Sequence, residues 1–193
     1  MEITDIKNRS VATKGIVMAN YSVTSSVFLR DFYSKNRQFA SKTNREEATE
    51  KQLSTADSLA LKKAIRALED YDYGDGSTDD TDAENIKFYK TLKAFADTYN
   101  YSLDSSTSSS SKDIKKLGKK MQEFASKYED ELEDLGITFS SKGYMEVSAS
   151  AVDNISKYNY GKTFSSTSST KSNFLSELNT LTQKVYRRID TYL

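Results

Sequence analysis

The chain has 193 residues, of which 36% are hydrophobic and 29% are charged, and its 28 basic side chains balance its 28 acidic ones. A chain of this length folds as one large domain or two small ones, and its low apolar content favours an elongated shape over a compact one. The balanced charge leaves no net field to attract nucleic acid or an anionic membrane surface, so neither is an expected partner.

The missing residue types exclude several kinds of site. The sequence has no Cys, His, Trp or Pro. It therefore cannot supply a thiolate nucleophile, an imidazole base or an ordinary zinc site, and we expect neither an enzyme nor a protein that holds a metal or cofactor. No stretch approaches the roughly 20 apolar residues of a membrane span, and the amino terminus lacks the apolar core of a signal peptide.

The amino-terminal part of the sequence has the weakest pattern. Residues 1–15 show no sustained hydrophobic period and are predicted to form a flexible lead-in. The remaining residues, 16–193, are expected to form one helical bundle domain. Within it, apolar residues from Val17 to Phe39 recur at roughly helical spacing and predict a first helix.

Two capping-box patterns mark the predicted starts of the second and third helices. In each pattern a hydroxyl side chain stands three residues before an acidic one, as in Ser54 with Asp57 and Thr81 with Glu84. The two side chains accept hydrogen bonds from two backbone amides that are otherwise unpaired at a helix start. Apolar stripes follow both patterns at helical spacing. The stripes are Leu61, Ala64, Ile65 and Leu68 in the second helix, and Ile86, Tyr89, Leu92, Phe95, Ala96 and Tyr99 in the third.

The segment over residues 71–82, YDYGDGSTDDTD, is a loop by composition. Its closely spaced carboxylates are the ligands that calcium prefers. Counting from Asp70, however, the fifth position is Gly74 and the sixth is Asp75, so the glycine and the carboxylate are out of place for an EF-hand loop. We expect a solvated acidic turn rather than a metal site.

Two serine-rich stretches, SSTSSSS over 105–111 and SSTSSTKS over 165–172, offer nothing to bury and are predicted to be linkers. Ser109 and Lys112 also have the Ser-x-x-Lys spacing of some hydrolases, but both residue types are so abundant there that chance explains it. A fourth helix with a seam close to that of a coiled coil is expected between the linkers. Its seam residues are Ile114, Leu117, Met121, Phe124, Tyr128, Leu132 and Leu135.

The stretch LGITFSSKGYMEVS, residues 135–148, predicts a β-hairpin. A glycine follows the last seam residue, where a left-handed helix cap is favoured, and apolar and polar residues then alternate on both sides of the loop SSKG. The glycine that ends this loop can take the positive backbone angle common in hairpins. A lone hairpin is marginal in water, so its apolar face must rest on helices. The hairpin residues are Gly136, Ile137, Phe139, Gly143, Met145 and Val147.

Two further helices complete the prediction of a mainly α fold, an elongated antiparallel bundle with one small antiparallel hairpin. A short helix is expected from Ala149 to about Tyr158, with Ser148 as its cap. The final helix, Phe174–Tyr192, carries an unbroken seam that fits a partner helix in the same chain or in a neighbouring one. In the second case the seam is the candidate assembly face. Its residues are Phe174, Leu178, Leu181, Val185 and Ile189.

The order of these elements resembles the carboxy-terminal region of the bacterial flagellar filament-capping family, also called hook-associated protein 2. In that family a helix ending in a Phe-Val-x-x-Tyr-Asn pattern precedes the same leucine-glycine-isoleucine hairpin. The resemblance covers about residues 86–193. The matching residues outside the hairpin are Phe95, Ala96, Tyr99, Asn100, Leu135 and Phe164.

The chain also departs from the family. Where the second strand usually ends in Asp, this chain has Ser148, and residues 1–80 are too few to hold the β-rich head of a full cap. The resemblance therefore implies a short relative without a head. It implies a structural stalk that packs on its own copies or on flagellin-like helices and is exported without a cleaved signal. The expected location is the flagellum or the cell exterior, while a cytoplasmic location stays open.

The alternative reading of the residues is a secreted or cell-surface binding module of adhesin type, without catalysis. The sequence has 13 tyrosines, some in the pairs YDY and YNY. Tyrosine offers a large contact area with a polar tip and is enriched at binding surfaces. The competing interpretation places these tyrosines at bundle edges with their hydroxyls in water.

Overall fold

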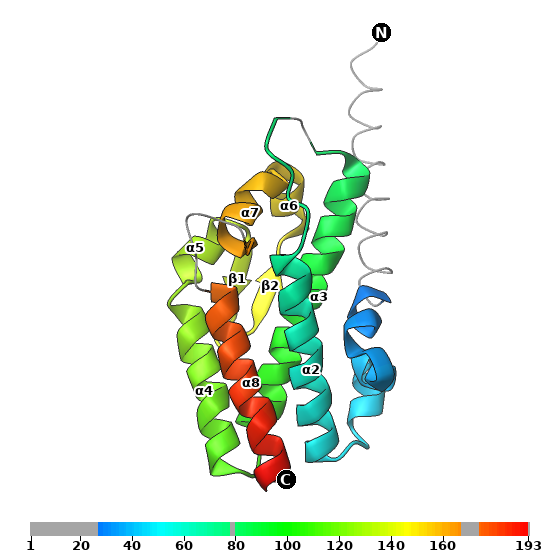
Figure 1. Ribbon diagram of the computed structural model, residues 1–193, viewed down its shortest axis with the longest axis vertical. Helices are drawn as coiled ribbons and strands as arrows, with labels where there is room; N and C mark the ends of the chain where they lie inside the picture. Colours follow the sequence, from blue (N-terminus) through cyan, green and yellow to red (C-terminus); the bar gives the residue numbers. More distant parts are fainter. Residues whose placement is uncertain (1–26, 78–79, 167–173, 193) are drawn as a thin grey trace.

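The computed structural model describes residues 27–77, 80–166 and 174–192 (Figure 1). The predicted lead-in over 1–15 and the predicted start of the first helix at Val17 lie outside the described residues. Within those ranges helices dominate and the sheet has two antiparallel strands, which confirms the mainly α fold with one hairpin.

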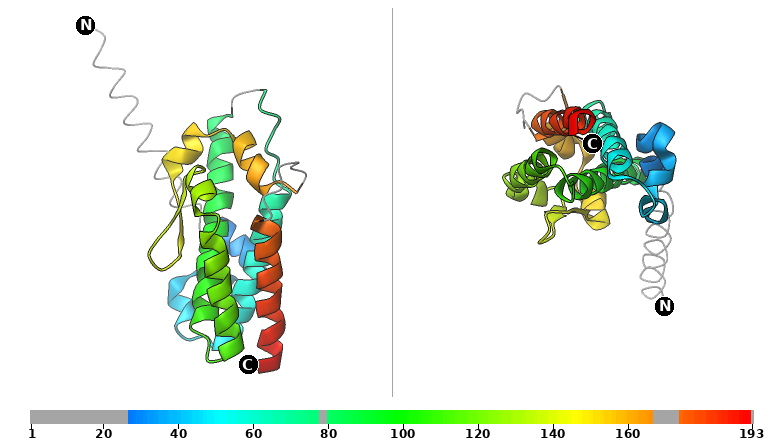
Figure 2. Two further views of the ribbon diagram at one scale, coloured as in Figure 1. Left: turned by 90° about the vertical axis from the view of Figure 1, so that its left-hand side faces the viewer. Right: turned by 90° about the horizontal axis from the view of Figure 1, so that it is seen from below.

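Four long helices form an elongated bundle, and each runs antiparallel to the one before it (Figures 1 and 2). Helix α3 packs between α2 and α4, and α8 packs against the same two helices, which closes the bundle. The four helices are α2 (Glu50–Glu69), α3 (Asp82–Thr107), α4 (Lys112–Ser126) and α8 (Phe174–Tyr192).

The connection between α4 and α8 carries the hairpin and three short helices at the upper end of the bundle in Figure 1. These elements are α5 (Glu129–Glu133), β1 (Ile137–Phe139), β2 (Met145–Val147), α6 (Ala149–Asn154) and α7 (Lys157–Phe164). Helix α3 is the longest of the described helices and contacts β2 and α6 as well as its bundle neighbours.

The bundle core is built largely from the predicted apolar stripes, although in α3 the unpredicted Phe88 is fully buried where Ile86 and Tyr89 are only half-buried. Each fully buried large side chain contributes about 1.5 to 3 kcal/mol relative to leaving it exposed, so these stripes hold the helices together. The largest fully buried side chains include Leu61, Ile65 and Leu68 from α2, Phe88, Leu92, Phe95, Tyr99 and Leu103 from α3, Ile114 from α4 and Phe174 from α8.

The capping prediction is right for α3 and wrong for α2. Thr81 and Glu84 form the predicted reciprocal pair at the start of α3. Helix α2 begins five residues earlier than predicted, because Thr49 and Gln52 form its capping box. A glutamine amide oxygen accepts the backbone N–H as a carboxylate does. The predicted cap residues Ser54 and Asp57 are buried inside the helix instead.

The predicted linker over 105–111 is shorter than expected, since only residues 108–111 connect α3 to α4. Helix α3 continues through Thr107, and Ser106 is fully buried. The hydroxyls of Ser106, Thr107 and Ser108 bond to backbone carbonyls one turn earlier, which satisfies them inside the helix. Small side chains also let α3 and α4 approach closely, since a Cβ on Gly118 would lie 2.5 Å from the Ser106 Oγ.

Two predicted helices are interrupted. The fourth helix stops at Ser126 and resumes as α5, and the turn brings the Tyr128 ring within 5.2 Å of Phe124 and 5.3 Å of Phe174, measured between centroids. The helix predicted from Ala149 to Tyr158 ends at Asn154, and α7 begins after Ser156, whose Oγ accepts from the Tyr158 N–H. Of the predicted linker over 165–172, only the first two residues are described.

A layer outside the bundle is formed by residues 27–45, which we call the N-terminal layer. It consists of a helical stretch over 27–33 and the 3-10 helices η1 (Ser34–Ala40) and η2 (Lys42–Arg45). It packs on α2 and α3 around a second apolar cluster that is separate from the main core. Phe39, predicted to end the first helix, lies in η1 and is buried.

Candidate assembly surface

The predicted seam of α8 lies inside the bundle. Phe174, Leu178, Val185 and Ile189 are at most 1% exposed and belong to the main core. Helix α8 makes its contacts with α2 and α4 of the same chain. The intramolecular alternative for this seam therefore holds, and the seam as a whole is not a face that a second chain can reach.

Leu181 is the exception, because it is only half-buried. It lies with Phe124 in a groove between α4 and α8, so the groove has an apolar floor. The rim is charged on both sides, with lysines in the majority. The remaining lining residues are Lys120, Glu123, Lys127, Glu177, Thr180 and Lys184.

The exposed charges of α4 and α5 are unevenly distributed, with lysines prevailing at one end and carboxylates at the other, although Asp113, Glu123 and Lys127 are exposed as well. The lower part of the two helices, which we call the basic strip, exposes Lys112, Lys115, Lys116, Lys119 and Lys120. Their upper part, which we call the acidic strip, exposes Glu129, Asp130, Glu131, Glu133 and Asp134. Helices α4 and α5 follow one another along the same side of the bundle (Figures 1 and 2). The zero net charge of the sequence hides this separation.

The predicted hairpin forms, with Ile137 opposite Val147 and Phe139 opposite Met145. Ile137 and Met145 are buried, and Phe139 and Val147 pack partly buried on the main core, so the apolar face rests on the helices as expected. The two hairpin glycines take the predicted left-handed conformation, with φ of +71° at Gly136 and +76° at Gly143.

Besides this apolar packing, the Asn100 amide makes two hydrogen bonds that hold the hairpin to α3. The Nδ2 of Asn100 donates to the carbonyl oxygen of Met145 at 2.9 Å, and its Oδ1 accepts from the Met145 N–H at 2.7 Å. Asn100 thus pairs with β2 along the edge that faces away from β1. The Tyr144 hydroxyl adds a hydrogen bond to Asp104 one turn further along α3, and this bond raises the tyrosine pKa to about 12.

A buried ion pair, which the sequence pattern did not reveal, joins the N-terminal layer to α2. The Arg45 guanidinium donates to both oxygens of Asp57, at 2.8 and 2.7 Å, and the Tyr33 hydroxyl donates to the same carboxylate at 2.6 Å. The guanidinium also lies 4.0 Å from the centroid of the Tyr101 ring. Burial raises the pKa of Asp57, and this effect outweighs the hydrogen bonds from Arg45 and Tyr33, which lower the pKa.

The acidic loop is anchored rather than fully solvated. Asp72 and Asp75 accept hydrogen bonds from backbone amides two residues ahead, and Asp80 forms an ion pair with the buried Lys157 at 3.4 Å. Lys157 also pairs with Glu84 at 3.1 Å. Burial would lower the pKa of Lys157, but Glu84 and Asp80 raise it. No group of three or more potential metal ligands occurs within the described ranges.

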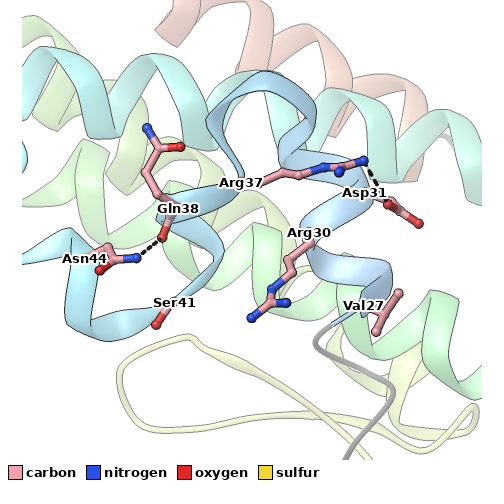
Figure 3. A pocket seen from close by; sticks show the side chains of 7 residues that line it. All are labelled: Val27, Arg30, Asp31, Arg37, Gln38, Ser41 and Asn44. Atoms are coloured by element: carbon pink, nitrogen blue, oxygen red, sulfur yellow. Dashed lines mark hydrogen bonds and ion pairs between the residues drawn. The ribbon is translucent and has the colours of Figure 1, made fainter.

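The remaining surface features are local. Figure 3 shows a pocket formed within the N-terminal layer, where Arg37 pairs with Asp31 and the Asn44 amide donates to the Gln38 carbonyl. The Ser109 hydroxyl, part of the Ser-x-x-Lys spacing, donates to Glu50. None of the described helices has the length and apolar run that crossing a bilayer requires.

Comparison of the chain with protein-family models, with curated proteins and with solved structures gave no match in any of the three.

Proposed function

We propose that this chain is a structural protein without catalysis that acts by helix packing, of the flagellar axial, filament cap-like type. Its partners are its own copies or flagellin-like proteins, and its place is the flagellum or the cell exterior. The observation that carries the proposal is the contact between Asn100 and Met145. Two parts of the sequence that resemble the filament-capping family, 45 residues apart, meet there in one docked unit.

Two further features support an assembly role. The Tyr160 hydroxyl donates to the carbonyl oxygen of Leu135 at 3.0 Å, so the elements between α4 and α8 form a firm end to the bundle. Among the tyrosines whose side chains are described, only Tyr158 and Tyr186 are exposed. The tyrosine surface on which an adhesin-like role would depend is therefore small, and we favour assembly.

The test is co-sedimentation with flagellar filaments isolated from the organism that encodes the chain. The wild-type protein is expected to sediment with the filaments, and Asn100→Leu, which removes both bonds to Met145, to bind less while the four-helix bundle stays folded. The matched control is Asn179→Leu, a change of the same kind on α8, away from the hairpin. A chain that neither binds filaments nor associates with itself would contradict the proposal.

A further inference from the structure

The basic and acidic strips do not neutralise each other within one molecule. From Lys116 to Glu129 the chain advances by 13 residues of mostly helical backbone, which corresponds to roughly 20 Å. Charges separated by more than the Debye length of about 8 Å at physiological salt are largely screened. Each strip therefore keeps its own field and attracts a surface of the opposite sign.

The basic strip is also placed against the preference of its own helix. Lys112, Lys115 and Lys116 lie in the first turns of α4, where the partial positive charge of the helix terminus favours acidic side chains. Asp113 is the acidic residue of that first turn. The helix terminus therefore does not favour a lysine in this first turn. Lys115 has an acidic neighbour within its own chain, because it interacts electrostatically with Glu50. For Lys112 and Lys116 we infer contact with an acidic surface of another molecule.

The two strips are spaced so that an antiparallel copy matches both. Suppose that two α4–α5 segments lie side by side in opposite directions, with the two-fold axis level with the exposed Glu123 and just beyond Gln122, whose side chain donates to the Lys142 carbonyl of the hairpin loop. Lys116 of each copy then comes opposite Glu129 of the other. Lys112 then comes opposite Glu133, and Lys115 opposite Asp130. An arrangement with two-fold symmetry makes every contact twice, so each strip of each copy faces a strip of opposite charge.

The centre of this arrangement contains the α4–α8 groove. The half-buried Leu181 and the Phe124 ring supply the apolar floor, and exposed charges surround it. An apolar centre with a charged rim is the usual composition of a protein interface.

We propose that two copies of this chain form a two-fold symmetric antiparallel dimer through the α4–α5 face and the adjoining α8 groove. The basic strip of each copy lies on the acidic strip of the other. The inference rests on the proposed assembly function, since it names the partner and the surface for self-association.

The experiment is sedimentation velocity over a range of protein concentrations. The wild-type chain is expected to dimerise, and its dimer dissociation constant to rise about tenfold or more between about 50 mM and about 500 mM salt. Reversal of the basic strip by Lys112→Glu with Lys116→Glu, or of the acidic strip by Glu129→Lys with Glu133→Lys, is expected to leave a folded monomer.

Mixing the two reversed variants is the decisive step. At positions 112, 116, 129 and 133 the first variant then has only acidic side chains and the second only basic ones. Every pair among these positions repels in a homodimer and attracts in a heterodimer, so the mixture is expected to form a heterodimer although neither variant dimerises by itself. A chain with all four changes is expected to dimerise again. The matched control, Arg30→Glu with Lys51→Glu, gives the same change of net charge as the basic reversal at exposed positions outside both strips and is expected to dimerise as wild type does.

Three outcomes would overturn the dimer. Self-association that survives both reversals would place the interface elsewhere and leave the assembly function standing. A wild-type chain that stays monomeric at low salt would exclude the dimer, while the filament experiment still tests the function separately. Binding of the monomer to a short DNA duplex through the same lysines would assign the basic strip to nucleic acid instead.

Discussion

The four-helix core and the N-terminal layer are stabilised in different ways. In the core, large apolar side chains of all four helices are fully buried. The N-terminal layer packs on α2 through a smaller apolar cluster and is also attached to it by a buried ion pair between Arg45 and Asp57, whose side chains are 12% and 0% exposed. Apolar burial tolerates small shifts of the contacting groups, whereas a buried ion pair stabilises only while both partners are in place.

This difference predicts two levels of stability. The N-terminal layer has few buried apolar residues, and polar contacts from Arg45 and from Lys63 of α2 contribute to its attachment. Such segments typically open locally before the whole domain unfolds. Ser34 adds backbone strain at the end of its first helical stretch, since its φ of +47° is rare for a residue other than glycine. We expect the layer to detach while the bundle stays folded.

The largest effect should come from a charge placed in the core. Leu178→Asp buries a carboxylate at a fully buried position and is expected to cost several kcal/mol and unfold the chain. Leu181→Asp, on the same helix but at the half-buried groove position, should leave the monomer folded and weaken the dimer. Circular dichroism and sedimentation check both variants, and equal unfolding by the two would contradict the placement of α8.

Breaking the ion pair tests the N-terminal layer. Arg45→Met leaves Asp57 buried without its partner, and the expected loss is about 3 to 5 kcal/mol of the free energy that holds the layer. Limited proteolysis should then cut within 27–45 while the bundle persists. The double variant Arg45→Met with Asp57→Leu removes both charges and should recover most of the loss. Cooperative unfolding of the whole chain by Arg45→Met would show that core and layer are one unit.

Replacement of the two hairpin glycines by alanine should destabilise the chain to different extents. A Cβ at Gly136 would lie 2.1 Å from the Ala151 Cβ, whereas at Gly143 it would meet the flexible Gln122 side chain at 2.7 Å. Each position also costs about 1 to 2 kcal/mol for a side chain in the left-handed region. Gly136→Ala should therefore lower the melting temperature clearly more than Gly143→Ala. The same loss at both positions would contradict the packing of α6 on the hairpin.

The smallest effect concerns pH. Hydrogen bonds from the Thr81 side chain and backbone, with Lys157 beside them, lower the pKa of Glu84 from 4.5 to about 2. A carboxyl group whose pKa is lower in the folded chain than in the unfolded chain stabilises the fold at pH values above the unfolded pKa. This stabilisation is lost as the pH falls from about 4.5 towards 2. Glu84→Gln keeps an amide oxygen for the cap, as Gln52 does in α2, and should flatten this part of the acid unfolding curve. An unchanged curve would contradict the coupling.

Much of the fold could be predicted because it depends on local pattern. The seam of α8 and the stripes of α2 and α3 have helical spacing, and the hairpin has strand alternation with a glycine at each position of positive φ. Short-range chemistry of this kind is present in the sequence whatever the rest of the chain does. The sequence misled where the prediction was based on composition alone. The serine-rich end of α3 was predicted to be a linker, but its hydroxyls form hydrogen bonds within the helix.

The polar contacts that join distant parts of the chain were decided by the tertiary structure. No hydrophobic period in the sequence indicates that these residues meet, because the two partners of each contact are far apart in the chain. The contacts join Asn100 to Met145, Arg45 to Asp57, and Lys157 to Asp80. The same holds for the seam of α8, whose spacing fits a partner helix in either chain until the fold places α2 and α4 beside it. The sequence by itself determined which faces are apolar and where the lysines and carboxylates gather, because side-chain chemistry and helical period are local. Only the packing of the bundle decided which apolar faces are covered and which charged strips remain outside, because burial depends on the whole chain.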